Sequence, residues 1–146
     1  MTGVPPLDEI IETFEVLDDW ENRFEYLIDL GKTVPILPLS ERTEDARVHG
    51  CQAQVWLRLG LDDQNDHRIW IRAASDAHIV QGLIAIVMAI YAGRTTNEAR
   101  TVDAEAIFRK LDLEAHLSGT RRNGLAAMIA RVRNLAAHQT AVGGDA

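Results

Sequence analysis

The chain has 146 residues, of which 47 % are apolar, and this composition suits one globular domain and excludes a disordered chain. Its formal net charge of −7 argues against general nucleic-acid binding, because neutralising phosphates requires a positive surface. The N-terminus lacks the basic and apolar segments of a signal peptide, and the longest apolar run, residues 79–92, is interrupted by Gln81 and Gly82. We therefore expect a cytoplasmic protein with no membrane span. Residues 1–146 are expected to form a single domain, with a core of about 8–138 and a frayed C-terminal tail.

Two helices are predicted before residue 32. The first is indicated by apolar residues at helical spacing, namely Leu7, Ile10, Ile11, Phe14 and Leu17. The second is expected to begin near Asp18 or Asp19 and to end at Gly31, a typical helix stop. The following segment, 33–47, holds two prolines and no sustained period, which predicts an extended connection.

Alternation of apolar and polar residues then predicts two strands. Residues 55–59 and 69–74 both alternate, and the segment GLDDQNDH between them is rich in turn-forming residues. An antiparallel hairpin is therefore expected. Ser75 or Asp76 is expected to cap the next helix, whose apolar residues run from 79 to 90 and cover most of its circumference.

The remainder is predicted to be helical. Short helices are expected near Thr96 and over residues 104–111, followed by a long final helix that Thr120 is expected to cap. The order of elements predicts an α+β domain in which a small antiparallel sheet packs against several helices.

Cys51 is the only cysteine, so no intramolecular disulfide can form. It lies between the proline-containing connection and the first strand, after Gly50, which permits unusual backbone conformations and close approach by a partner. A lone cysteine is often a buried apolar filler, and that alternative stays open. The scattered histidines do not provide the ligand spacing of a zinc site, and one thiol is too few for an iron–sulfur cluster. A hydrolase with Cys51 as nucleophile and a distant histidine as base also stays open.

Three segments in the same order resemble motifs of the SufE family. GCQAQVW at 50–56 resembles its active-site segment, SDAHIVQGLIAIV at 75–87 its Ser-Asp and Gly-Leu segment, and HLSGTRRNGLAAMI at 116–129 its C-terminal Arg-containing segment. The similarity covers residues 8–138. One departure is Ala53, where family members often carry serine.

The resemblance implies the fold shared with IscU-like scaffold proteins. It also implies that Cys51 accepts persulfide sulfur from a cysteine desulfurase of the SufS/CsdA type and passes it to a SufB-type scaffold for iron–sulfur cluster assembly. The chain would stimulate the desulfurase and act as an accessory sulfurtransferase, not as a stand-alone enzyme. It would need no cofactor or metal of its own, since pyridoxal phosphate (PLP) belongs to the desulfurase. The alternatives are a Cys-nucleophile enzyme acting on a small substrate, and a binding module with a structural cysteine.

The same resemblance singles out residues around Cys51. Arg121 matches the family arginine and is expected either to support a thiolate or dock a partner, or else to bond a carboxylate or loop carbonyl at a helix start. Asp76 is expected to be a helix N-cap, and Trp56 a packing residue beneath the loop. His49 is a less favoured proton donor or acceptor for the thiol, because neighbours in an extended chain point in opposite directions. Gly82 and Gly124 are expected to allow close helix packing.

Overall fold

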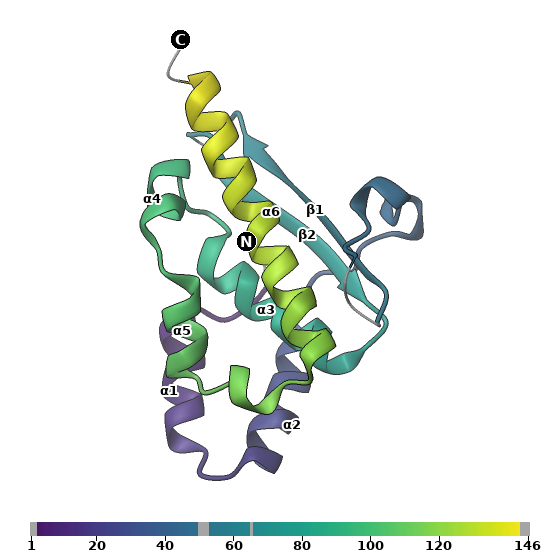
Figure 1. Ribbon diagram of the computed structural model, residues 1–146, viewed down its shortest axis with the longest axis vertical. Coiled ribbons are helices and arrows are strands. Elements are labelled where there is room, and N and C mark those ends of the chain that lie inside the picture. Colours follow the sequence, from purple (N-terminus) through teal and green to yellow (C-terminus); the bar gives the residue numbers. More distant parts are fainter. Residues whose placement is uncertain (1–2, 50–52, 65, 144–146) are drawn as a thin grey trace.

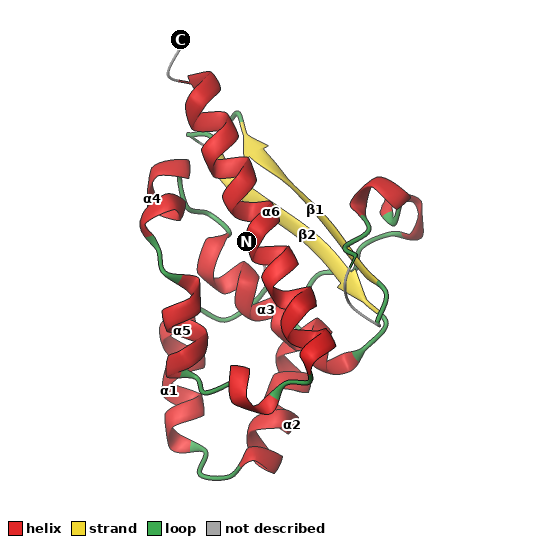
Figure 2. Ribbon diagram, in the orientation of Figure 1, coloured by secondary structure: helices red, strands yellow, loops and turns green. Residues whose placement is uncertain are grey.

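The computed structural model describes residues 3–49, 53–64 and 66–143. Within these ranges the chain forms an α+β fold in which one two-stranded antiparallel hairpin lies among the helices (Figures 1 and 2). The predicted fold class is therefore confirmed. Within the described part of the chain, no helix is long and apolar enough to cross a membrane.

The first two helices are α1 (Leu7–Val16) and α2 (Trp20–Gly31), close to the predicted positions. Asp19 caps α2, because its carboxylate accepts a hydrogen bond from the Asn22 backbone N–H at 2.8 Å. Arg23 closes the turn between the helices by donating from Nε to the carbonyl oxygens of Phe14 and Leu17. These bonds fix the angle between α1 and α2.

The hairpin consists of β1 (Val55–Asp62) and β2 (Arg68–Ser75), paired from Val55 with Ser75 to Asp62 with Arg68. Alternate residues point to opposite faces, as predicted. One face is mostly buried and carries Val55, Leu57, Ile69, Ile71 and Ala73, whereas the other carries Trp56, Arg58, Trp70 and Arg72. The two tryptophans thus share the more exposed face.

Helix α3 (His78–Tyr91) forms the centre of the core, with most of its residues buried. It crosses α2 at Gly82, where an added Cβ would lie 2.1 Å from the carbonyl oxygen of Leu27. The prediction that Gly82 permits close helix packing is therefore confirmed. The predicted cap of α3 is wrong: the N-cap position is Ala77, which has no side-chain cap, and Asp76 bonds elsewhere.

Three more helices complete the chain: α4 (Thr96–Thr101), α5 (Ala104–Lys110) and α6 (Gly119–Gly143). Single 3-10 turns are η1 (Leu39–Glu41), η2 (Glu44–Ala46) and η3 (Glu114–His116). The predicted cap of α6 is wrong, because Thr120 lies inside the helix and the Ser118 hydroxyl accepts the Arg121 N–H instead. Helix α6 extends through residues 141–143 of the expected tail and passes in front of the hairpin in Figure 1.

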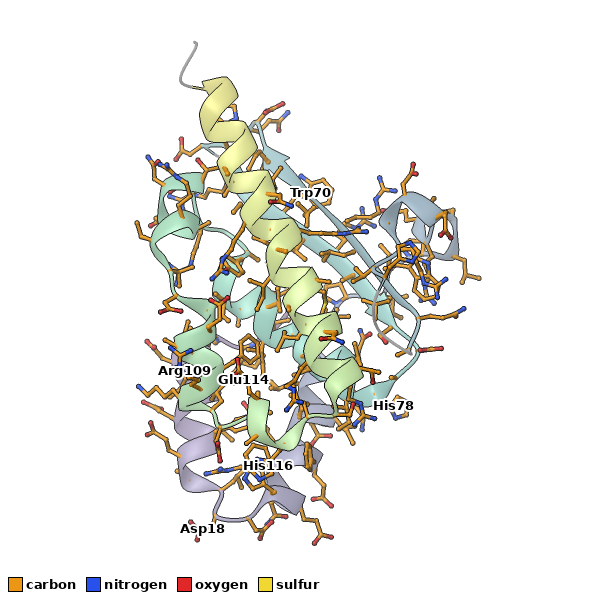
Figure 3. The ribbon with its side chains drawn as sticks, viewed as in Figure 1. Asp18, Trp70, His78, Arg109, Glu114 and His116 are labelled. Carbon is orange, nitrogen blue, oxygen red and sulfur yellow. The ribbon has the colours of Figure 1, made fainter. Side chains whose placement is uncertain are left out.

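The turn η3 joins the beginning of α6 to the first helical layer. The His116 ring stacks on the Trp20 ring of α2, with centroids 3.7 Å apart and an interplanar angle of 17°. His116 also contacts the backbone oxygen of Asp112 through Nδ1 at 3.1 Å. The stacking of His116 on Trp20 holds the start of the C-terminal segment against α2. Figure 3 labels His116.

Candidate functional site

The chain segments on either side of residues 49–54 are hydrogen-bonded to each other. The Val48 N–H donates to the Val55 carbonyl at 2.8 Å, and Arg47 forms an antiparallel bridge with Trp56. Val48 and Val55 are both buried, so this closure is part of the core. Cys51 and Gly50 belong by sequence to the enclosed segment but lie outside the described residues, and their predicted roles stay predictions.

On the C-terminal side, Asp76 fixes the chain next to β1. Its Oδ1 accepts the Gln54 backbone N–H at 2.9 Å, and its own N–H donates to the Gln54 carbonyl at 3.2 Å. The carboxylate thus continues the β1–β2 pairing by one residue. A charged acceptor makes such a hydrogen bond stronger than a neutral one does. Asp76 therefore belongs to the candidate site as an anchor of the segment that follows Cys51.

On the N-terminal side, Arg131 of α6 holds the chain that leads to Cys51. Its guanidinium donates to the carbonyl oxygen of Ala46 at 3.1 Å and to that of Arg47. Both carbonyls immediately precede the Val48–Val55 closure. Sequence reasoning missed Arg131. Its only sequence signal is its place beside the buried positions Met128 and Val132 of an amphipathic helix.

Trp56 contacts the segment that precedes Cys51, and its predicted packing beneath the loop itself stays a prediction. It is half-buried, and the guanidinium carbons of Arg42 and Arg47 lie 5.4 and 6.0 Å from the centre of its ring. Arginine groups at this distance from an indole face are attracted by its π electrons. Arg42 also donates from Nε to the Leu37 carbonyl at 3.0 Å. The indole of Trp56 thus contacts both ends of segment 42–47.

His49 and Arg121 make few contacts with the described residues. His49 is exposed, and its Nε2 lies 3.6 Å from Oε1 of Glu44, which is also exposed. Arg121 is half-buried in the first turn of α6, and its guanidinium forms no hydrogen bond or ion pair with another described residue. It lies ten residues before Arg131, or about 15 Å along the helix axis. Their predicted roles toward the thiol stay predictions.

A second arginine of α6, Arg133, connects this helix to α5. Arg133 forms a two-pronged ion pair with Glu105 of α5, one prong being the Nη1–Oε2 hydrogen bond at 2.6 Å. This hydrogen bonding holds the pKa of Glu105 below its ordinary value. Arg131 and Arg133 thus tie α6 to two different elements. Among the described residues, no three His, Cys, Asp or Glu side chains come together as a metal site.

Comparison with known proteins identifies the family. The model of the SufE family, described as an Fe-S metabolism associated domain, matches residues 8–136. The chain belongs to the SufE family. An uncharacterised SufE-like protein of Rhizobium meliloti is 46 % identical over 129 residues, covering 88 % of this chain and 92 % of the relative. Another from Rhizobium etli is 45 % identical over 128 residues, with 87 % and 86 % covered.

A solved structure supports the fold. The solution structure of a hypothetical protein from Thermus thermophilus superposes with a TM-score of 0.71, covering 92 % of this chain and 96 % of that one. Its sequence identity is 22 %, so it shows the fold alone. The family match and the two relatives confirm the expected membership in the SufE family, and with it a role in Fe-S metabolism.

Proposed function

We propose that this SufE-family chain is a sulfur carrier, which accepts persulfide sulfur on Cys51 from a PLP-dependent cysteine desulfurase. It stimulates the desulfurase and delivers the sulfur to the iron–sulfur cluster assembly machinery in the cytoplasm. Family membership supports the process, and the single cysteine, which lies in a segment that resembles the family's active-site motif, supports the carrier role.

The proposed step is a thiol–disulfide type exchange. The Cys51 thiolate attacks the outer sulfur of the desulfurase persulfide, a new S–S bond forms, and the S–S bond within that persulfide breaks. The desulfurase thiolate leaves with the electron pair and takes up a proton. The outer sulfur moves from the desulfurase cysteine to Cys51 with no net oxidation. One thiol therefore suffices, and no second cysteine or external oxidant is required.

The observation that carries the proposal is the anchoring of both flanks of the segment containing Cys51. Arg131 holds the carbonyls of Ala46 and Arg47, the Val48–Val55 bond closes the segment, and Asp76 holds Gln54. An attacking group placed on a short segment between fixed ends loses little freedom when a partner binds. A buried filler cysteine would need no such anchoring from two other elements.

Intact mass spectrometry tests the carrier role directly. The chain is mixed with a desulfurase and free cysteine, and we expect a mass gain of about one sulfur atom that thiol reduction removes. The matched control is Cys51→Ser, which should gain nothing. A substrate-derived adduct in place of sulfur would favour the Cys-nucleophile enzyme. No adduct, together with no stimulation of the desulfurase, would favour a structural cysteine.

Protection of the thiol is a further part of this proposal. A persulfide is easily oxidised, so we expect Cys51 to be sheltered in the free chain and exposed on docking. The apolar Val55 and the half-buried Trp56 next to the segment support this expectation. Alkylation of Cys51 should therefore be faster with an inactive desulfurase present than without it. Equal rates would contradict the shelter.

A further inference from the structure

Over the second half of β1, the edge that faces away from β2 has no strand partner among the described residues. Odd-numbered residues of β1 direct their peptide groups away from β2, as the bond from Val48 to the Val55 carbonyl shows. Beyond the Arg47–Trp56 bridge, no hydrogen bond joins the peptide groups of Leu59 or Leu61 to another residue that the structure describes. These two residues therefore offer N–H and C=O groups at an open strand edge, which readily pairs with another chain.

A hollow of about 610 Å³ lies along this edge. Its lining includes Leu57 and Leu59 of β1, Asp45 of η2, Asn134 of α6 and Trp70 of β2. Both η2 and α6 contact β1. The hollow thus lies where η2 and α6 meet the edge of β1, a place where an extended peptide can lie against the strand.

Trp70 reaches this edge because residue 60 has no side chain. Gly60 pairs with Trp70, and a Cβ at Gly60 would lie 2.8–3.0 Å from atoms of the indole. The ring therefore lies across the backbone of β1 while remaining 37 % exposed. Figure 3 labels Trp70 beside α6. An exposed indole next to an open strand edge gives an incoming chain an apolar contact.

The charge around the hollow is cationic although the whole chain carries −7. Arg58 and Arg72 share a single carboxylate, Glu41, at 3.8 and 2.6 Å. Arg131 lines the hollow and donates to neutral carbonyl groups, so those bonds leave its charge uncompensated. Among the described residues that line the hollow, Asp45 is the one acidic group. Such an excess of guanidinium groups attracts carboxylates.

We propose that an extended, acidic segment of a partner protein binds here by adding a strand to the free edge of β1. Its peptide groups pair with Leu59 and Leu61. Side chains of an added strand alternate between the two faces of the sheet, so acidic residues lie beside Arg58 and apolar ones beside Leu59. The expected recognition pattern is therefore an alternation of acidic and apolar residues. A second copy of this chain would bring its own Arg58 against the same face, and the charge disfavours it.

The test uses the full-length chain and a displayed library of random peptides. Selected peptides should alternate acidic and apolar residues over about five to seven positions, the length of a typical strand. When a selected peptide is added to the ¹⁵N-labelled chain, hydrogen exchange should slow at the Leu59 and Leu61 amides. Arg58→Glu should weaken binding by about tenfold or more. The matched control is Arg109→Glu on α5, which makes the same charge change outside the hollow and should bind as the wild type does.

A second probe separates strand addition from charge attraction alone. The selected peptide, N-methylated at alternate residues, keeps its side chains but loses backbone donors, and its affinity should fall about tenfold or more. Equal affinity for the methylated peptide would overturn the proposal. So would selected peptides without acidic residues, or protection at other amides. A dimer of the free chain with Leu59 and Leu61 already protected would assign the edge to a second copy instead. None of these measurements depends on sulfur transfer, so their outcome is independent of the proposed sulfur-carrier function.

Discussion

Replacing Arg131 by methionine tests whether α6 holds the segment that leads to Cys51. Methionine keeps a long apolar stem in the helix but cannot donate to the carbonyls of Ala46 and Arg47. Hydrogen bonds from charged donors contribute about 1.5–3 kcal/mol each, and part-buried carbonyls regain some hydration when the donor is lost. We therefore expect a net loss of about 2 kcal/mol, a change of roughly thirtyfold in the opening of this segment.

Hydrogen exchange at the Val48 amide measures this loss locally, because that N–H closes the segment by donating to Val55. Exchange at Val48 should accelerate about tenfold or more in Arg131→Met, and alkylation of Cys51 should accelerate with it. The matched control is Arg133→Met, which removes the ion pair with Glu105 on the same helix and should leave Val48 exchange unchanged. Unchanged Val48 exchange in Arg131→Met, with the helix intact, would refute the anchoring by α6.

Substitutions at three other residues have defined expected outcomes. Gly82→Ala should lower the free energy of unfolding by about 2 kcal/mol or more in urea, since a Cβ 2.1 Å from the Leu27 carbonyl outweighs a gain of about 1 kcal/mol in helix propensity. An unchanged midpoint would contradict this packing. Asp76→Ala should speed the alkylation of Cys51, whereas Asp76→Asn, which keeps an acceptor for the Gln54 N–H, should speed it less. Alkylation of Asp76→Ala at the wild-type rate would exclude the anchoring role of Asp76. Glu105→Gln should destabilise the chain at pH 7 but less below about pH 4, because the lowered pKa of Glu105 makes its contribution disappear as the carboxylate is protonated. A pH-independent difference would refute this.

The elements that the sequence predicted well are those whose signals are local. The alternation of apolar and polar residues over 55–59 and 69–74 indicates the two faces of the hairpin, because successive side chains of a strand point in turn to the buried and to the more exposed face. The apolar circumference of α3 likewise indicated a helix at the centre of the core. Gly82 within this apolar helix indicates a close helix contact, because a glycine there has few other uses.

The anchors of the candidate site carry no comparable signal. Asp76 has the side chain of a good N-cap next to a helix start, and local preference alone predicts a cap. The structure instead pairs its backbone with Gln54, and this pairing places the carboxylate beside the Gln54 N–H, 22 residues away in sequence. The choice between these partners depends on the strand register, which the residues around Asp76 do not encode.

Arg131 illustrates the same limit over a larger separation. Its carbonyl acceptors lie 84 and 85 residues earlier, and a backbone carbonyl looks the same in every sequence. A charged residue beside the buried stripe of α6 could equally have formed an ion pair, as Arg133 does with Glu105. Only the packing of α6 against β1 decides between these partners. The candidate residue and its motif can therefore be recognised in the sequence, whereas the contacts that position the flanks of its segment require the fold.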